Sequence, residues 1–400
     1  MDPRTLAHKY RDDLLDNTLP FWVPAAIDEE HGGYFTALDR TGQLLQTDKP
    51  VWFQGRFAWV LASVAQVTEP NKPWLDLAKH GLDFLEAHCV DIDGRYFFQV
   101  TREGKPLRKR RYVFSECFAA MAMAAYGNAA DDDTYRRKAT DLFQFLLHQL
   151  ETPGLLEPKV NPEVRPMKGL AVPMILIGVA QEVRKATGDP LCNEVIDRCV
   201  AEIRRDFMKP ELGCVLETVG PEGKIIETFE GRQVNPGHSI ELAWFLLEES
   251  RRRPSPELVT MGLQIIDWML EMGWDQEYGG LYYFRDCRGL PNAEYWHDMK
   301  FWWPHAEAII ATLLAWRITG EERYLRWYQK ISEWTESHFA DPEFGEWFGY
   351  LHRDGTLSTS LKGNDFKGPF HIPRMQLYCW QLMENPNVKP GDLVGSSGLA

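Results

Sequence analysis

The chain has 400 residues, of which 44% are hydrophobic and 12% aromatic, and its formal net charge is −14. This acidic balance argues against a nucleic-acid-binding protein, which needs basic stripes, and seven cysteines without a CxxC pair argue against a disulfide scaffold or a cysteine zinc site. Without a signal-peptide core or an apolar run of membrane-spanning length, we expect a cytoplasmic protein with no membrane partner.

A pattern of roughly sixty residues recurs six times along the chain. Each copy has a Gly-plus-aromatic segment that resembles a β-hairpin, followed by a helix that opens on a polar or ionisable residue. The hairpin segments are 31–42, 93–104, 153–160, 212–223, 278–289 and 344–355, and the helix-opening residues are Arg56, Glu116, Lys168, His238, His305 and His371. The gap between hairpin and polar residue is similar in five copies and shorter before Lys168, so the repeat also places chemical groups.

Between these helices lie others with charged faces, which the helical periodicity predicts near 3–17, 73–90, 132–151, 188–207, 255–272 and 320–339. The polar-headed helices, such as AVPMILIGV and AIIATLLAW, are apolar most of the way round and are expected to be buried. This alternation predicts an all-α fold, an (α/α)6 barrel of six inner and six outer helices. The short β-hairpins and the starts of the inner helices are expected at one end. We expect one catalytic domain over 1–385 and a disordered tail over 386–400, which is rich in Pro, Gly and Ser.

A proline lies within two residues of each of His238, His305 and His371, and proline is favoured in the first helical turn. Asn235 is a suitable N-cap for the helix that carries His238. The positive end of a helix dipole disfavours an imidazolium ion. We therefore expect three neutral histidines that are able to act as bases.

Two pairs are spaced by three residues and so share a helix face: His238 with Glu241, and His371 with Arg374. A carboxylate beside an imidazole fixes its tautomer and restores basicity, which suggests Glu241 as the partner of His238. His305 and Glu307 are two apart and diverge by about half a turn.

Three histidines raise the question of zinc, but HExxH is absent and no acidic cluster has ligand spacing, so we expect no metal. GxSxG and GxGxxG are also absent. Histidines converging with Arg56 at the mouth of an aromatic-lined barrel fit proton abstraction next to a carbonyl. One histidine removes a proton, Arg56 steadies the oxyanion and a second histidine returns the proton on the other face.

The chain resembles the N-acylglucosamine 2-epimerase (renin-binding protein) family over residues 31 to 374. The strings that carry the resemblance are HGGYFT, FSECF, the AVPM of KGLAVPM, the GR of EGRQVNPGH with Glu241, YGGLYYF, KFWWPHAE, DPEFGEWFGYL and FKGPFHIPR. The resemblance implies an (α/α)6 barrel and reversible C2 epimerisation of N-acetylglucosamine and N-acetylmannosamine. Ring opening, deprotonation to a cis-enediolate, rotation and reprotonation on the opposite face are the implied steps.

The resemblance also implies roles for single residues. His238 and His371 match the acid/base pair, Arg56 matches the essential arginine, and His305, Glu241 and Glu307 match supporting residues. We expect the catalytic set His238, His371, Arg56 and Glu307, and substrate binding by His305, Glu241, Glu116, Arg374, Trp302 and Trp303. No cofactor is expected. ATP as an allosteric activator that is not consumed, and a homodimer, are implied by the family, although no phosphate-binding loop is visible.

Alternative functions remain open at the level of sequence. Cellobiose 2-epimerases and aldose–ketose isomerases share the barrel and histidines, but cellobiose epimerases tend to have Gln in place of His305, which favours an acetamido sugar. Asn364 and Pro369 depart from the Gly and Cys common in relatives, which leaves the substrate less defined. An (α/α)6 glycoside hydrolase or lyase using two of Glu116, Glu241 and Glu307, and a protein-binding module without activity, are the other classes.

Overall fold

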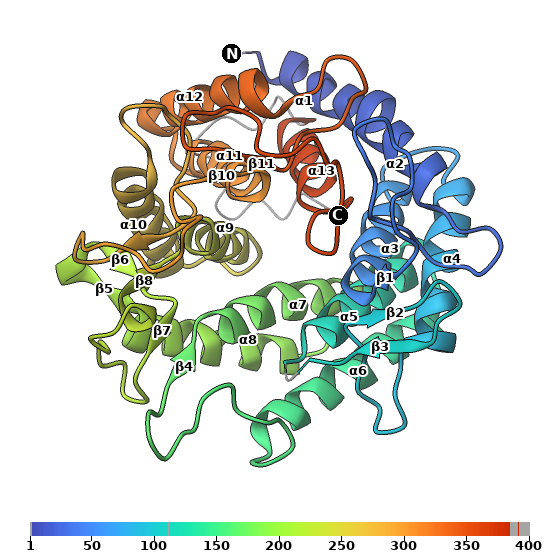
Figure 1. Ribbon diagram of the computed structural model, residues 1–400, viewed down its shortest axis with the longest axis horizontal. Coiled ribbons are helices and arrows are strands. Elements are labelled where there is room, and N and C mark those ends of the chain that lie inside the picture. The colour runs from blue at the N-terminus through green and yellow to red at the C-terminus, as the bar shows by residue number, and fades with distance from the viewer. Residues whose placement is uncertain (1, 111, 385–390, 392–400) are drawn as a thin grey trace.

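The computed structural model describes residues 2–110, 112–384 and 391 (Figure 1). The tail expected to be disordered, 386–400, lies outside these residues except for Gly391. Among the described residues, six helices form an inner ring and six helical segments surround it (Figure 1). The predicted (α/α)6 barrel is therefore confirmed.

The outer ring starts with α1 (Pro3–Asp12), which continues through a π-helical turn (Asp13–Thr18) into α2 (Leu19–Ala26). The other outer helices are α4 (Lys72–His88), α6 (Asp133–Glu151), α8 (Leu191–Glu202), α10 (Pro256–Gly273) and α12 (Glu322–Phe339). These bounds lie within a few residues of those predicted from periodicity, except that α8 starts later and passes into a π-helical turn (Ile203–Phe207).

The inner ring consists of α3 (Val51–Ala65), α5 (Phe114–Ala129), α7 (Ala171–Thr187), α9 (Pro236–Arg252), α11 (Trp302–Thr319) and α13 (His371–Glu384). Each inner helix packs against the next, and α13 closes the ring by packing against α3 and α1. Every residue of α11 from Trp302 to Ile318 is buried, whereas α12 buries one face through Tyr324, Tyr328 and Ile331. The two helix types predicted from the sequence thus occupy the two rings.

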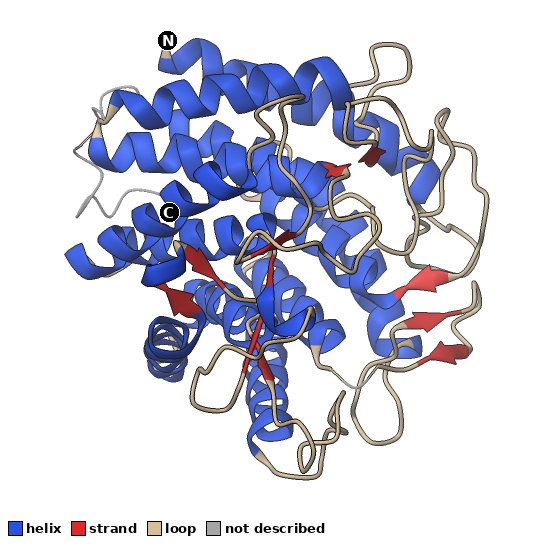
Figure 2. Ribbon diagram, turned by 60° about the vertical axis from the view of Figure 1, so that its left-hand side comes forward, coloured by secondary structure: helices blue, strands red, loops and turns tan. Residues whose placement is uncertain are grey.

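Short strands connect neighbouring repeats instead of closing each hairpin on itself. The strands β1 (Lys49–Pro50), β4 (Lys168–Gly169), β8 (Gln233–Val234) and β10 (Lys300–Phe301) each lie just before an inner helix. Each pairs antiparallel with a strand of the next repeat: β2 (Gln99–Val100), β7 (Thr218–Val219), β9 (Arg285–Asp286) and β11 (Tyr350–Leu351) respectively. The strands lie among the loops at the end where the inner helices begin (Figure 2).

Two local hairpins complete the strands: β3 (Pro106–Arg108) pairs with β2, and β5 (Met208–Lys209) pairs with β6 (Cys214–Val215). The segment 153–160, expected to be a hairpin, contains turns and no strand. The predicted hairpin is therefore wrong for 153–160, whereas local antiparallel pairs occur at β2–β3 and, as isolated bridges, at Leu38–Leu44 and Leu351–Leu357. The Gly-plus-aromatic segments also join one inner helix to the next.

A buried ionic group fixes three of these connections. Asp28 accepts hydrogen bonds from the Lys49 ammonium at 2.7 Å and from the Arg102 guanidinium at 2.9 Å, and its other oxygen accepts the backbone N–H groups of the following turn. The same Asp–Lys–Arg group recurs as Asp275 with Lys300 and Arg353, and as Asp341 with Lys362 and Arg40. Each group holds a loop against the start of an inner helix, and so positions the site.

Within the described part of the chain, no helix is long and apolar enough to span a lipid bilayer.

Candidate active site

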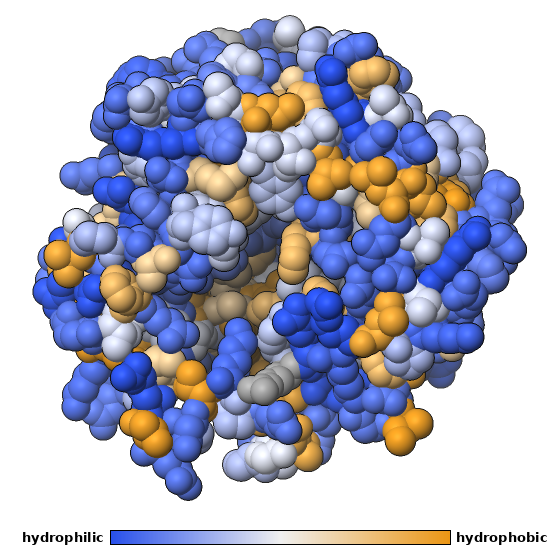
Figure 3. Space-filling model, viewed as in Figure 1, coloured by the Kyte–Doolittle hydropathy of each residue, from blue (hydrophilic) through white to orange (hydrophobic). Residues whose placement is uncertain are grey.

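A cavity of about 830 Å³ occupies the inside of the inner ring. Figure 3 shows the face hollowed at its centre, with apolar residues inside the hollow and hydrophilic side chains around it. Seven residues predicted to form the site line this cavity: Arg56, His238, Glu241, Trp302, Trp303, His371 and Arg374. They come from α3, α9, α11 and α13, so the closed ring brings together groups that lie more than three hundred residues apart in the sequence.

His371 begins α13, and its Nδ1 lies 2.7 Å from Oε1 of Glu307 on α11. A carboxylate accepts hydrogen bonds, so Nδ1 carries the proton and Nε2 keeps a lone pair for a substrate. Burial and the nearby cations of Arg374 and Arg56 hold the pKa of His371 well below 6.5. His371 is therefore a neutral imidazole at pH 7, which is the form that acts as a base.

Glu307 is fully buried and uses both carboxylate oxygens. Oε1 faces His371, and Oε2 accepts a hydrogen bond from the indole N–H of Trp244 at 2.7 Å. Glu307 does not line the cavity. It is placed to orient His371 and not to touch a substrate directly.

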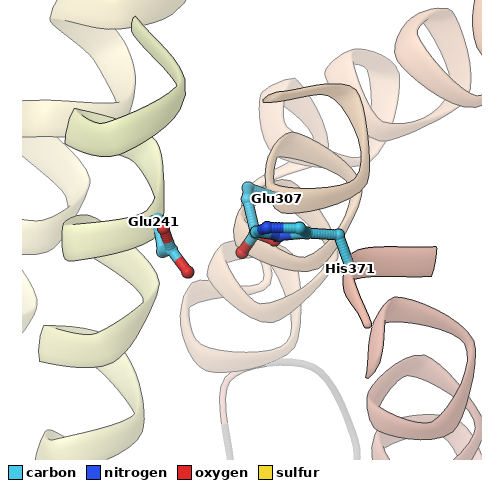
Figure 4. Close-up of side chains that lie close together, drawn as sticks. All are labelled: Glu241, Glu307 and His371. Atoms are coloured by element: carbon cyan, nitrogen blue, oxygen red, sulfur yellow. The ribbon is translucent and has the colours of Figure 1, made fainter. Parts of the chain in front are cut away.

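Arg374 joins the two carboxylates at the centre of the site. Its Nη2 donates to Oε1 of Glu307 at 2.6 Å and to Oε1 of Glu241 at 2.5 Å. Figure 4 shows how Glu241, Glu307 and His371 approach one another from α9, α11 and α13. Their ligand atoms lie within 4.8 Å of one another, as in a metal site, but the Arg374 guanidinium already contacts all three and lies 3.3 Å from Nδ1 of His371. A cation of the protein itself thus occupies this position.

His238 lies in the first turn of α9, and its backbone N–H donates to the side chain of Asn235, the predicted N-cap. Its Nδ1 lies 2.9 Å from Oε2 of Glu217. Glu241, three residues along the helix, pairs with Arg374 instead. The predicted His238–Glu241 pair is therefore wrong, and Glu217 is the carboxylate that fixes the tautomer of His238.

The charge state expected for His238 also changes. Burial alone would lower its pKa, but the carboxylate of Glu217, with further contributions from Glu241 and Glu307, outweighs burial and raises the pKa above 6.5. The helix dipole predicted a neutral ring, and the sequence did not place Glu217 beside it. The two histidines of the cavity thus differ: His238 favours its proton and His371 gives it up.

The indole of Trp303 lies close to both histidine rings, with centroids 5.0 Å from His238 and 5.7 Å from His371. Trp302 meets His371 edge-on at 6.4 Å. Both tryptophans line the cavity at the end where the inner helices begin. The ring of Trp303 therefore offers an apolar face between the two histidines.

Arg56 lies in the second turn of α3, one turn deeper than predicted, and its guanidinium is surrounded by aromatic rings. It lies 4.1 Å from the centroid of Phe118, 4.7 Å from Phe370 and 5.2 Å from Trp52. No ion pair to a described residue neutralises it, and its Nε is buried without a partner. Burial lowers the pKa of Arg56 to about 9, so the group is still a cation at pH 7. An unpaired cation facing a cavity suits a developing oxyanion.

Two of the residues expected to bind substrate do not reach the cavity. Nε2 of His305 accepts the N–H of Leu281 at 2.9 Å, and Nδ1 donates to the carbonyl of Phe301 at 2.6 Å. Burial lowers the pKa of His305 to about 3. Glu116 is bonded to the Arg95 guanidinium and to the N–H of Tyr96. Both residues fix the connections between repeats.

Lys168 also departs from its predicted place. It lies in β4, before α7 begins, and its ammonium group is bonded to Glu202 and Asp206. The shorter gap of that repeat reflects this position outside the helix.

Solved structures of sugar epimerases and of a D-mannose isomerase have the same barrel fold. The model of the family described as N-acylglucosamine 2-epimerase (GlcNAc 2-epimerase) matches residues 33–372. The chain belongs to this family.

Similar proteins support this assignment. The chain is 36% identical to the N-acylglucosamine 2-epimerase of Mus musculus over 382 residues, which cover 92% of this chain and 90% of that relative. It is 25% identical to the cellobiose 2-epimerase of Eubacterium cellulosolvens over 410 residues, which cover 93% and 96%. The chain is therefore a sugar 2-epimerase, an enzyme of the isomerase class.

Solved structures agree on the fold. The cellobiose 2-epimerase of Bacillus thermoamylovorans superposes with a TM-score of 0.83 at 18% identity, covering 94% of this chain and 99% of that chain. A D-mannose isomerase superposes with a TM-score of 0.80 at 19% identity, covering 95% and 98%.

Proposed function

We propose that this enzyme interconverts N-acetylglucosamine and N-acetylmannosamine by proton transfer at C2. The observation that carries the proposal is the pair of histidines with opposite proton preferences beside an unpaired arginine in one cavity. The acetamido sugar is favoured because the identity to N-acylglucosamine 2-epimerases, 36%, exceeds the 25% to cellobiose 2-epimerases.

The first step takes the proton from C2 of the open-chain sugar. Nε2 of His371 accepts this proton, the C2–H electrons form a C1–C2 double bond, and the electrons of the C1 carbonyl move onto O1. The cation of Arg56 stabilises the negative O1 of this enolate, which is of the cis-enediolate type. Glu307 holds the His371 ring and its tautomer. A positioned base of this kind contributes about 10²–10⁴-fold to the rate.

The second step returns a proton to the other face of C2. Rotation within the cavity turns that face toward His238, whose imidazolium donates the Nε2 proton as the O1 electrons rebuild the carbonyl. Glu217 holds the His238 ring and favours its charged form. At the end His371 carries the proton and His238 is neutral, so the reverse reaction runs through the same groups with exchanged roles.

The proposal is tested by incubating the protein with N-acetylmannosamine in deuterated water and following the sugar by NMR. We expect N-acetylglucosamine with deuterium at C2. His238→Ala and His371→Ala are each expected to abolish net conversion while the circular dichroism spectrum stays unchanged. Conversion retained by either variant contradicts the two-histidine mechanism, and accumulation of a 2-ketose identifies an aldose–ketose isomerase.

A second candidate is epimerisation or isomerisation of another free sugar, such as cellobiose or mannose, on the same barrel. The match to cellobiose 2-epimerases along 93% of the chain favours it. A panel of free sugars in deuterated water separates the candidates, because the preferred sugar exchanges its C2 proton fastest. Running the panel with and without ATP tests the expected activation by ATP. Size-exclusion chromatography with light scattering tests the expected homodimer.

A further inference from the structure

The cavity extends along the whole barrel, well beyond the proposed catalytic groups. On α3 it is lined by Trp52, Arg56, Trp59 and Ser63, which with the C-cap residue Gln66 form one stripe from the first turn to the end of the helix. A helix rises 1.5 Å per residue, so this stripe spans about 20 Å. The lining residues of α7, α9 and α13 likewise continue to the last turns. The cavity therefore has a second half at the end of the barrel away from the hairpins.

A layer of apolar and aromatic side chains lies between the two halves. Trp244, Phe245 and Leu377 line the cavity one turn further along their helices than Glu241 and Arg374. Trp59 and Tyr378 belong to the same layer, because Trp59 lies one turn beyond Arg56 and the Tyr378 ring lies 5.3 Å from Trp244, and beyond this layer the lining becomes polar. We call this second half the rear chamber, and define it by Trp59, Glu182, Lys185, Glu248, Arg252 and Tyr378. No role in the proposed proton transfer falls to any of these residues.

Two aromatic rings of the rear chamber are fixed by carboxylates from other helices. The indole N–H of Trp59 on α3 donates to Oε2 of Glu182 on α7 at 3.0 Å, although α5 lies between these helices in the ring. The hydroxyl of Tyr378 on α13 donates to Oε2 of Glu248 on α9. Both rings keep one polar edge occupied and present apolar faces, and each carboxylate has a second oxygen available to accept a hydroxyl group. Rigid rings next to carboxylate acceptors suit the C–H faces and hydroxyl groups of a sugar.

The rim of the rear chamber carries two unpaired cations. Lys185 and Arg252 are exposed, and neither forms an ion pair with a described residue. The arginines that precede them in the sequence are paired: Arg184 forms an ion pair with Glu249, and Arg251 forms one with Glu248. In a chain with net charge −14, two free cations at the mouth of a cavity attract an anionic group.

We propose that the rear chamber is a second ligand site that binds an acidic sugar. The sugar ring lies against Trp59 and Tyr378, its hydroxyl groups bond to Glu182 and Glu248, and its phosphate or carboxylate faces Lys185 and Arg252. The ligand reaches this site from the end of the barrel where the inner helices end, while the epimerised sugar uses the hairpin end.

The test is isothermal titration calorimetry of the full chain with glucose 6-phosphate, glucuronate, glucose and inorganic phosphate. We expect the two acidic sugars to bind at one site, and glucose and inorganic phosphate each to bind at least tenfold more weakly, because each supplies only half of the contacts. The double variant Lys185→Glu/Arg252→Glu is expected to lose at least tenfold in affinity for both acidic sugars. The matched control is Arg326→Glu, an exposed arginine on the outer helix α12, which is expected to bind as the unchanged protein does.

Two further measurements show whether the acidic sugar binds in the rear chamber and whether the double variant is folded. Binding is expected to survive His371→Ala, because that residue lies in the other half of the cavity, and C2 exchange in the absence of acidic sugar is expected to survive the double variant, which shows that it is folded. Absence of binding to the full chain overturns the proposal. Loss of binding in His371→Ala but not in the double variant also overturns it. Neither result bears on the C2 epimerisation, which is assayed separately.

Discussion

His238 and His371 face one cavity but hold their protons with different strength. Each uses Nδ1 to bond a carboxylate, Glu217 or Glu307. The difference comes from the second neighbour of each pair: Arg374 also bonds Glu307 and places a cation beside His371, whereas no cation contacts Glu217 among the described residues. In the proposed mechanism this difference makes His238 the acid and His371 the base.

This assignment predicts how kcat/KM falls in acid and how it falls in base. The reaction direction considered is the one that starts from neutral His371 and charged His238. In this direction activity is lost in acid only when His371 becomes protonated, which requires a low pH because the pKa of His371 lies well below 6.5. Activity is lost in base when His238 is deprotonated, and its pKa lies above 6.5. We expect kcat/KM to be flat across pH 6.5, with limbs on either side. A single limb centred at pH 6.5 contradicts the assignment.

Glu217→Gln tests the carboxylate that sequence reasoning missed. The amide keeps a hydrogen bond but removes the charge, so the pKa of His238 falls and the alkaline limb moves to lower pH. On the alkaline limb, a shift of one pKa unit costs about tenfold in kcat/KM. The control is Glu222→Gln, an exposed carboxylate in the turn that follows β7. Identical profiles for Glu217→Gln and the unchanged protein would show that Glu217 does not tune His238.

At the scale of elements, the connections between repeats position the catalytic groups. The strand before each of α3, α7, α9 and α11 pairs with a strand of the following repeat, and a buried Asp–Lys–Arg group fixes three of the loops. Lys300 and Asp275 are both fully buried side chains joined at 3.0 Å. The desolvation of such ions is offset only while both partners are present.

Asp275→Asn is accordingly expected to destabilise the fold by about 3 kcal/mol, because it leaves Lys300 buried without its counter-ion. Urea unfolding measures the change, with Asp76→Asn as a control in the exposed pair Lys72–Asp76, where less than about 1 kcal/mol is expected. The pair with Lys300 and Arg353 depresses the pKa of Asp275 strongly. The ionised Asp275 side chain therefore contributes fully to the free energy of unfolding above about pH 4, and this contribution is lost as the pH falls. Equal, small losses in both variants would mean that the buried group does not hold the loop.

At the scale of the whole molecule, the sequence repeat predicts the barrel closely. The predicted helix 320–339 is observed as Glu322–Phe339, and 132–151 as Asp133–Glu151. Both follow from apolar periodicity, which is a local property of the chain. The strand pairing was not predictable in the same way, because it joins segments some fifty residues apart through backbone bonds that carry no sequence signal.

Only part of the site was predictable from the sequence. Helix starts converge, so His238 and His371 meet as expected, but a position in the first turn does not fix the direction of a side chain. His238 is the third residue of α9 and His305 the fourth of α11, a difference of about 100° around the helix. The ring of His305 therefore stacks on Trp334 at 4.9 Å, away from the cavity. Glu217 was missed because it lies in a loop segment and reaches His238 only through the tertiary fold.

The central claim is that two histidines act on opposite faces of C2, and half-reaction exchange tests it most directly. Each epimer is incubated in deuterated water with His238→Ala or His371→Ala, and deuterium at C2 is measured in the recovered sugar. We predict that each variant exchanges C2 of one epimer without converting it, and that the two variants exchange different epimers, because each retains the base for one face. Exchange of the same epimer by both variants, or net conversion by either, would contradict the account.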